Sequence, residues 1–275
     1  MKNIVKSDLI LEASKGLKTG DGFYREVKKL SHGIKQTNVK ILDKKTAKRI
    51  GREVGNYISF TFDDLLYYDL NSKKFLSKII KFAIKTILKE NNLSPKKILV
   101  VGLGNEKYAC DSLGKKVVDK VLITKPFLER DLFSSRKMAE IYAISLGVYG
   151  TTGLESSETT KSICKMLKPD LVIAIDSLVA SDVKTLSLSV QISDTKLSPG
   201  GGVGNNRKEI SEELLDVKVL AVGVPLVVKF NGNNNFIVTI KDVEEKVEQL
   251  SKIISNAINL CFCHLTEKEY LELTN

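Results

Sequence analysis

The sequence predicts an α/β protein with a largely parallel central sheet flanked by helices and a small β-containing addition at its N-terminus. The runs 98–101 and 171–175 are apolar throughout, as expected of parallel strands that are buried on both faces. Apolar residues recur at three- and four-residue spacing in 72–91 and 241–260, which is typical of amphipathic helices that cover a sheet. Before residue 70, apolar and polar residues alternate, which indicates the additional strands.

The composition is that of a globular chain with one sizeable core. The chain has 275 residues, 43% of them hydrophobic, and a mean hydropathy of −0.05. We therefore expect residues 1–275 to form a single α/β domain, with residues 1–70 as an arm and strands within it. No run approaches the roughly eighteen apolar residues of a membrane span, and the first residues lack the apolar core of a signal peptide. The sequence thus predicts a cytoplasmic protein with no membrane partner.

The net charge of +10 permits two interpretations. It suits an acidic partner or the neighbourhood of nucleic acid, but many lysines fall at the spacing of a solvated helix surface. The four cysteines form no Cys-x-x-Cys pair, which fits a reducing compartment. Cys261 and Cys263 are too close to His264 in sequence for a usual structural zinc site, so we interpret them as a helix end.

The N-terminal elements follow from local patterns. Residues 7–13 are a short apolar segment framed by acids, and 15–31 is a charged arm or edge strand. Residues 33–42 alternate as a strand, and Asp43 is a suitable cap for a helix over 44–50. A second alternating strand and the first long helix come next, over 56–62 and 72–91.

The central part places a strand before a tight turn and weaker elements after it. The run 98–105 is a buried strand that stops at Gly-Leu-Gly-Asn, and 117–122 is the helix that packs back on it. Residues 122–124 suggest a short strand and 136–145 a helix. The turn 150–153 then leads into a further helix, capped by its threonine or glycine.

The last third alternates strands and loops before a final helix. Residues 179–182 are predicted to turn, 186–192 to form a partly exposed strand and 217–225 a buried one. Between these two strands, 193–209 is so rich in glycine that its backbone must adopt conformations closed to other residues or approach something closely. The final helix is expected over 241–260.

Two aspartates carry the most promising chemistry. Asp111 follows the Gly-Leu-Gly-Asn turn, and Asp176 ends the second apolar run. Open α/β sheets build their sites outside the carboxyl ends of parallel strands, so both carboxylates are expected at one rim. Two close carboxylates cannot both ionise easily, so one keeps a proton while the other takes one from water, which can then attack an amide. The alternative is that each aspartate only caps the helix after its strand.

Other chemistries find less support. Only His32 and His264 exist, and neither lies beside a strand end or a glycine turn, so a nucleophile paired with histidine is hard to assemble. Cys110 has no local base and is interpreted as a packing residue. The turn at 102–104 lacks the third glycine of a dinucleotide site, because Lys107 occupies that position. We expect neither a cofactor nor a metal.

The order of several motifs resembles the spore germination protease family over nearly the whole chain. Minor matches are Ser7-Asp8-Leu9-x-x-Glu12 and Lys48-Arg-x-Gly51-x-x-x-Gly55-x-Tyr57. The main matches, in chain order, are Gly102-Leu-Gly-Asn105 with Asp111-x-x-Gly114, Thr152-Gly153-x-Glu155-x-x-Glu158, Lys168-Pro-Asp-x-Val-Ile-Ala-Ile-Asp176, Gln191-Ile-Ser-Asp-Thr195 and Pro199-Gly-x-Gly-Val-Gly-Asn205-x-Arg-Lys-Glu209.

The resemblance implies an endopeptidase that degrades small acid-soluble spore proteins, the DNA coats of dormant spores, when germination begins. It implies an atypical aspartic protease, made as a zymogen in the forespore or spore core, that assembles as a homotetramer and needs no nucleic acid. The two catalytic aspartates of the family fall on Asp111 and Asp176. The family shares its fold with hydrogenase maturation proteases, which bind nickel through an additional histidine that has no counterpart identified here.

This sequence departs from the family pattern at several places. Ala109-Cys110 replaces the Thr-Pro pair that usually precedes the first aspartate, and Lys115 stands where proline is common. Only six residues precede Ser7, so the usual propeptide would be nearly absent. A long segment of typical members is missing between 230 and 237, a region that could shape substrate access or subunit contacts.

The resemblance also suggests which residues bind substrate. We expect Gly153, Glu155 and the loop glycines Gly200, Gly201 and Gly202 to wall the cleft with backbone donors. Family substrates are cut beside a glutamate, which a cation should meet.

We expect that cation to be Arg207 or Lys208, because a bidentate guanidinium suits a carboxylate. The alternative is that the two residues are only solvated charges at a helix start. Two other functions stay open for the whole chain. One is a non-proteolytic paralogue that binds acidic spore proteins or DNA, and the other is a metal-guided maturation protease.

Overall fold

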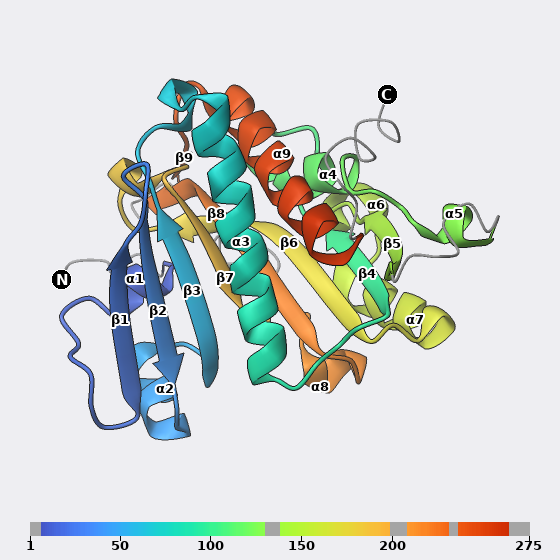
Figure 1. The fold of residues 1–275 in the computed structure, drawn as a ribbon, viewed down its shortest axis with the longest axis horizontal. Coiled ribbons are helices and arrows are strands. Elements are labelled where there is room, and N and C mark those ends of the chain that lie inside the picture. Colours follow the sequence, from blue (N-terminus) through green and yellow to red (C-terminus); the bar gives the residue numbers. More distant parts are fainter. Residues whose placement is uncertain (1–6, 130–137, 199–207, 231–235, 264–275) are drawn as a thin grey trace.

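The computed structural model describes residues 7–129, 138–198, 208–230 and 236–263. Within these ranges the strands form one mixed sheet in the order β1-β2-β3-β7-β8-β6-β4-β5, with β9 beside β8 (Figure 1). The strands are β1 (Phe23–Lys29), β2 (Lys35–Ile41), β3 (Gly55–Thr61), β4 (Lys97–Gly102), β5 (Glu140–Ser145), β6 (Leu171–Ala180), β7 (Ser189–Ser193), β8 (Val219–Phe230) and β9 (Phe236–Val238).

The sheet has a parallel and an antiparallel part. Strands β5, β4, β6 and β8 pair in parallel, which confirms the predicted parallel core. Strands β1, β2, β3 and β7 pair antiparallel and join this core where β7 meets β8. The N-terminal strands are therefore an extension of the same sheet.

Helices cover both faces of the sheet. On the near face of Figure 1, α3 and α9 lie side by side, and α4 packs on the same hydrophobic cluster. The opposite face is covered by α7 and α8. The helices are α1 (Ile10–Ala13), α2 (Lys44–Ile50), α3 (Leu70–Glu90), α4 (Leu113–Val118), α5 (Lys125–Glu129), α6 (Tyr149–Thr152), α7 (Ser156–Leu167), α8 (Glu212–Leu215) and α9 (Val243–Phe262), with 3-10 turns η1 (Leu65–Tyr67), η2 (Ala109–Asp111) and η3 (Val183–Thr185).

Because side chains alternate along a strand, each apolar run contributes to the hydrophobic clusters on both faces of the sheet. In β4, Ile98 and Val100 face the α3–α9 layer, whereas Leu99 and Val101 face α7. All four side chains are 1% exposed or less. A strand that is buried on both faces needs no polar residue until it ends, which is why the run is continuous.

The helices α2, α3 and α9 lie within about two residues of where the sequence predicts them. Asp69 accepts a hydrogen bond from the Ser72 amide at 2.7 Å and so fixes the start of α3. The predicted Asp43 cap of α2 is also confirmed, since its Oδ1 accepts from the Thr46 amide at 2.7 Å. The helix α2 ends at Gly51, which adopts the left-handed conformation.

The helix predicted over 136–145 is wrong. Residues 130–137 lie outside the described ranges, and 140–145 form β5, which pairs in parallel with β4 from Lys97 to Gly102. The segment is partly exposed at the sheet edge and rich in Glu, Met and Ala, so its local pattern resembles a helix surface. Pairing with a buried neighbour overrides that preference.

The short strand predicted at 122–124 is also wrong. No strand forms there, because the polar groups have side-chain partners instead. The Leu122 amide donates to Asn259 Oδ1 at 2.9 Å. The Thr124 hydroxyl donates to the Ala139 carbonyl at 2.7 Å and accepts from the Ile141 amide at 2.7 Å. This side chain therefore bonds the backbone at the start of β5, where a neighbouring strand would otherwise pair.

The turn predicted at 179–182 begins later than expected, because β6 continues to Ala180. Beyond the end of β4, β6 still pairs with β8, with a β-bulge between Leu178 and Val179. The N-terminal segment supplies further partners to this extension. The Asp8 amide donates to the Val179 carbonyl at 2.7 Å, and the Val179 amide donates to Asp8 Oδ2 at 2.9 Å.

The cysteines near the C-terminal end of α9 belong to the core. Cys261 and Cys263 are buried, and burial raises the pKa of each thiol to about 12. They end a helix as predicted, and His264 lies outside the described residues. None of the described helices combines the length and the apolar composition that crossing a bilayer requires.

Candidate active site

The turn after β4 is built around a close backbone approach. Gly104 has φ +102°, and a Cβ atom there would lie 2.1 Å from the Asp111 carbonyl oxygen and 2.8 Å from Asp111 Oδ1. Only glycine fits that space. The turn is held to its neighbours on both sides, because the Leu103 amide donates to Ile175 O at 2.9 Å and the Leu146 amide donates to Gly102 O at 2.8 Å.

Asp111 is half-buried at the end of η2. Its Oδ2 accepts a hydrogen bond from the Asn105 amide at 2.8 Å, which closes the loop between them. Helix α4 starts after Ser112 and has no side-chain cap hydrogen bond. Asp111 therefore holds the turn rather than the helix, so the helix-cap alternative does not apply to it.

Asp176 lies inside β6 and is 5% exposed. It stands opposite Gly223 of β8, and its Oδ1 accepts from the Ser177 amide at 2.9 Å. No helix follows it, so the helix-cap alternative fails here too. By strand alternation its side chain lies on the face of Val172 and Ala174, which is the face covered by α7 and α8.

Both aspartates lie at the carboxyl end of β4. The last residue of that strand, Gly102, is in register with Ile175, so Asp176 is the first residue of β6 beyond it. The turn η2 that ends in Asp111 contacts β6 and β8. The predicted rim of the parallel sheet thus carries both carboxylates.

Cys110 does not have the properties of a nucleophile. Burial, and then the neighbouring Asp111 carboxylate, raise the pKa of its thiol above the usual value. The thiol is therefore protonated at neutral pH. Its side chain packs against the larger hydrophobic core, as the sequence interpretation expects.

The predicted helix start, with Gly153 as its cap, is wrong by two residues. Gly153 ends α6 with φ +69°, and α7 begins at Ser156 after Glu155, whose side chain makes no capping hydrogen bond. The segment nevertheless follows β5, which is parallel to β4, so Gly153 and Glu155 come from the same rim as the aspartates.

The glycine-rich loop can be described only at its ends. Gly200, Gly201, Gly202 and Arg207 lie outside the described residues. The two ends are joined by an antiparallel bridge between Leu197 and Ile210. Both of these side chains pack in the cluster on the Asp176 face of the sheet.

Lys208, the other predicted cation, pairs with an acid of this chain. Its ammonium lies 2.7 Å from Glu158 Oε1 in the first turn of α7. The hydrogen bond from Lys208 holds the pKa of Glu158 below its usual value, and Glu158 in turn raises the pKa of Lys208. The pair therefore joins the loop end to α7 at neutral pH.

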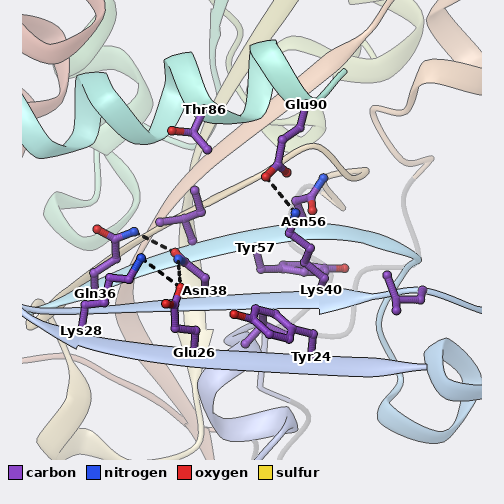
Figure 2. A pocket seen from close by; sticks show the side chains of 13 residues that line it. Tyr24, Glu26, Lys28, Gln36, Asn38, Lys40, Asn56, Tyr57, Thr86 and Glu90 are labelled. Carbon is purple, nitrogen blue, oxygen red and sulfur yellow. Dashed lines mark hydrogen bonds and ion pairs between the residues drawn. The ribbon is translucent and has the colours of Figure 1, made fainter. Parts of the chain in front are cut away.

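A groove of about 550 Å³ lies elsewhere, between α3 and the face of β1–β3 that is turned toward this helix (Figure 2). Its polar side chains satisfy one another. Asn38 donates to Glu26 at 3.1 Å, Gln36 donates to Asn38 at 2.8 Å, and Lys40 pairs with Glu90 at 2.8 Å. The groove lies in the antiparallel part of the sheet and contains neither aspartate.

The structure adds N-terminal residues that sequence reasoning left without a role. Besides Asp8 on β6, Glu12 accepts from the Ser181 amide at 2.8 Å, and Gln191 of β7 accepts from the Ile10 amide at 2.7 Å. The short segment at 7–13 is thus docked on β7 and on the strand that carries Asp176. The Ser-Asp-Leu-x-x-Glu motif was the only available signal, because nothing local indicates where these acids bind.

Among the described residues, no three His, Cys, Asp or Glu side chains gather in a way that could hold a metal ion.

The sequence model of the germination protease family matches residues 8–232. The chain belongs to the germination protease family. The match includes the docked N-terminal segment, the Gly102–Asn105 turn, both aspartates and the glycine-rich loop, as the motif order predicts.

Individual germination proteases agree with this assignment. The germination protease of Caldanaerobacter subterraneus subsp. tengcongensis is 39% identical over 231 residues, which cover 82% of this chain and 69% of the relative. That of Clostridium perfringens strain SM101 is 31% identical over 309 aligned positions, covering 93% of this chain and 94% of the relative. This aligned length exceeds 275, so the relative has residues that this chain lacks.

Among solved structures, the [NiFe] hydrogenase maturation protease HycI from Thermococcus kodakarensis is 16% identical. It matches with a TM-score of 0.38, over 64% of this chain and 99% of that one.

Proposed function

We propose that this germination protease is an endopeptidase that cleaves small acid-soluble spore proteins by an aspartic-type mechanism. The observation that supports it best is the shared position of Asp111 and Asp176 at the carboxyl end of β4, where η2 contacts β6. Family membership supports peptidase activity. The proposal also includes the substrate, the location in the forespore or spore core, control as a zymogen, and assembly as a homo-oligomer, with a tetramer as the expected form.

In this mechanism one carboxylate is ionised and its partner carries a proton. The ionised aspartate takes a proton from water as the water oxygen bonds to the scissile carbonyl carbon. The other aspartate donates its proton to the carbonyl oxygen as the tetrahedral intermediate forms. When the intermediate collapses, the C–N bond breaks and the leaving nitrogen takes up a proton from the aspartate that had accepted it from water. One hydroxyl of the intermediate returns its proton to the other aspartate as the carbonyl re-forms, so the pair again shares one proton.

The surrounding residues have supporting roles in the proposal. Gly153, Glu155 and the glycines at 200–202 would bind the extended substrate with backbone groups, because segments with accessible N–H groups suit peptide carbonyls. Arg207 or Lys208 would meet the glutamate beside the cleaved bond. For Lys208 this requires release from Glu158, since the two are paired without substrate.

The test is incubation of the purified protein with a small acid-soluble spore protein, followed by mass measurement of the fragments. We expect discrete internal cleavage that Asp111→Asn and Asp176→Asn each reduce by about a thousandfold or more, since the general acid–base pair is lost. Asp242→Asn is the matched control. Asp242 is exposed at the start of α9, where no side-chain capping bond depends on it.

Three outcomes would contradict the proposal. Undiminished cleavage in either aspartate variant would remove the mechanism. Binding of the spore protein without hydrolysis would favour the non-proteolytic paralogue. Cleavage that a chelator stops and a divalent metal restores would favour a metal-guided maturation protease.

A further inference from the structure

Helix α3 carries an unbalanced set of lysines. Between Leu70 and Lys89 it contains six lysines and no acidic residue, in a chain whose net charge is +10. Five of the six, from Lys74 to Lys89, recur at intervals of three or four residues, so they lie along one side of the helix, and Lys74 has an interaction of its own. We name Lys78, Lys81, Lys85 and Lys89 the lysine row.

The lysine row faces away from the core. Lys78, Lys85 and Lys89 are exposed and Lys81 is partly exposed. The opposite side of α3 is occupied by packing against the sheet and α9, as the near layer of Figure 1 shows. The buried apolar residues of that side are Leu76, Ile80, Ala83, Ile84, Ile87 and Leu88.

Within the described part of the chain, no acid pairs with the lysine row. The flanking acids are used elsewhere, since Asp69 caps the helix and Glu90 pairs with Lys40 at 2.8 Å. The neighbouring helix α9 is different, because its Glu248 lies 3.2 Å from Lys252. One of two adjacent helices is thus charge-balanced and the other is not.

The row works against the stability of the helix that carries it. Like charges four residues apart, such as Lys81 with Lys85 and Lys85 with Lys89, each destabilise a helix by a few tenths of a kcal/mol. Solubility alone needs no such arrangement, since mixed charges serve equally well. Lys81 lies over the Phe82 ring, 5.8 Å from its centroid, but within the described residues none of the four ammonium groups has an acidic partner. Such a row is best explained by an anionic partner.

We propose that the lysine row is a docking surface for duplex nucleic acid, which it contacts through the phosphate backbone. At about 1.5 Å per residue the row spans roughly 16 Å, the length of about five phosphates along one strand. Lysine contacts to phosphate carry no base specificity, so binding does not depend on sequence.

Two other anionic partners suit the row less well. An amphipathic helix binds a membrane surface by inserting its apolar face, but that face of α3 is already buried in the core. An acidic protein presents its carboxylates at spacings set by its own sequence, whereas a duplex offers the same phosphate spacing at every position. Both are outcomes that the experiment separates from the proposal.

The test compares two fourfold variants with the same loss of charge. One is K78Q/K81Q/K85Q/K89Q. The control is K29Q/K35Q/K44Q/K184Q, which changes four exposed lysines on other elements that form no ion pair within the described residues. Binding to a labelled 20-base-pair duplex of arbitrary sequence is measured by fluorescence anisotropy at several salt concentrations.

We expect the wild type and the control to bind with similar salt dependence. The row variant should bind about tenfold more weakly or worse at low salt, and the slope of log K against log salt should fall by about three to four, since each lost phosphate contact contributes about 0.9. If the fourfold variant is unfolded by circular dichroism, the single Gln variants should each lower the slope by about one.

The proposal is overturned if the wild type does not bind the duplex or if both fourfold variants weaken it equally. It is also overturned if polyglutamate or vesicles with anionic lipid bind in a row-dependent manner while the duplex does not. The assay requires no proteolysis, so its failure leaves the proposed function untouched.

Discussion

The backbone amide of Leu103 donates a hydrogen bond of 2.9 Å to the carbonyl oxygen of Ile175. Leu103 opens the turn that leads to Asp111, and Ile175 directly precedes Asp176. One bond between the first residue after β4 and its neighbour on β6 therefore fixes the relative position of the two segments that carry the aspartates. Changes that loosen this contact should affect activity before they affect the rest of the fold.

Gly104→Ala tests the close approach in the turn. The new Cβ would meet the Asp111 carbonyl at 2.1 Å in a backbone conformation that L residues rarely adopt, so we expect a loss of about 2–4 kcal/mol in unfolding free energy and at least a tenfold loss of cleavage. Urea denaturation and the cleavage assay measure these. The control is Gly150→Ala, where a Cβ meets nothing within 4 Å. Equal effects of the two substitutions would contradict the prediction.

Asp8→Ala tests whether the N-terminal segment supports β6. Loss of the carboxylate leaves the Val179 amide without its acceptor, so we expect faster hydrogen exchange at Val179 and a loss of about 1–2 kcal/mol in unfolding free energy. Asp8→Asn keeps an acceptor oxygen and should lose less. If the segment positions Asp176, kcat should fall more than KM changes. Unchanged exchange at Val179 in the alanine variant would refute this role.

The ion pair between Asp64 and Lys246 predicts a pH dependence of stability. Burial alone would raise the pKa of Asp64, but hydrogen bonds from Lys246, at 2.7 Å, and from the Leu66 amide hold it below the usual value. A lowered folded-state pKa contributes stability above the unfolded value near 4, and this is lost as pH falls through the folded value.

We therefore expect Asp64→Asn to cost about 1–2 kcal/mol in unfolding free energy at pH 7 and progressively less below pH 4. Thermal unfolding of both proteins between pH 3 and pH 7 measures the difference. The exposed Glu213→Gln serves as control and should match the wild type throughout. A difference that stays constant with pH would show that packing, rather than charge, is responsible.

Lys208 and Glu158 should affect substrate binding in opposite directions. If Lys208 receives the substrate glutamate, Lys208→Gln should raise KM about tenfold for a peptide cut beside glutamate, and Glu158→Gln should lower KM because it frees the ammonium. Lys165→Gln, on an exposed position of the same helix as Glu158, is the control. If Lys208→Gln and Glu158→Gln change KM in the same direction, the pair only joins the loop to α7.

Local sequence patterns identified the elements whose burial is decided along one segment. The apolar run of β4 indicates a strand that is buried on both faces, and the three- and four-residue spacing of α3 and α9 indicates helices with one buried side. Periodicity alone separates the two, because buried strands and amphipathic helices differ in it. Asp111 and Asp176 were singled out as candidates for the same reason, since each follows such a run. Family motifs supplied the rest of the candidate site.

Patterns failed where a distant segment supplied the partner. Residues 140–145 form a strand because β4 offers a free edge, and β6 continues past Asp176 because β8 and Asp8 pair with its extension. No sequence window contains both partners of such contacts. The sequence thus determined which stretches enter the core and which acids follow them, whereas only the tertiary structure decided the register that brings the two acids to one end of β4, since hydrogen bonds between remote strands set it.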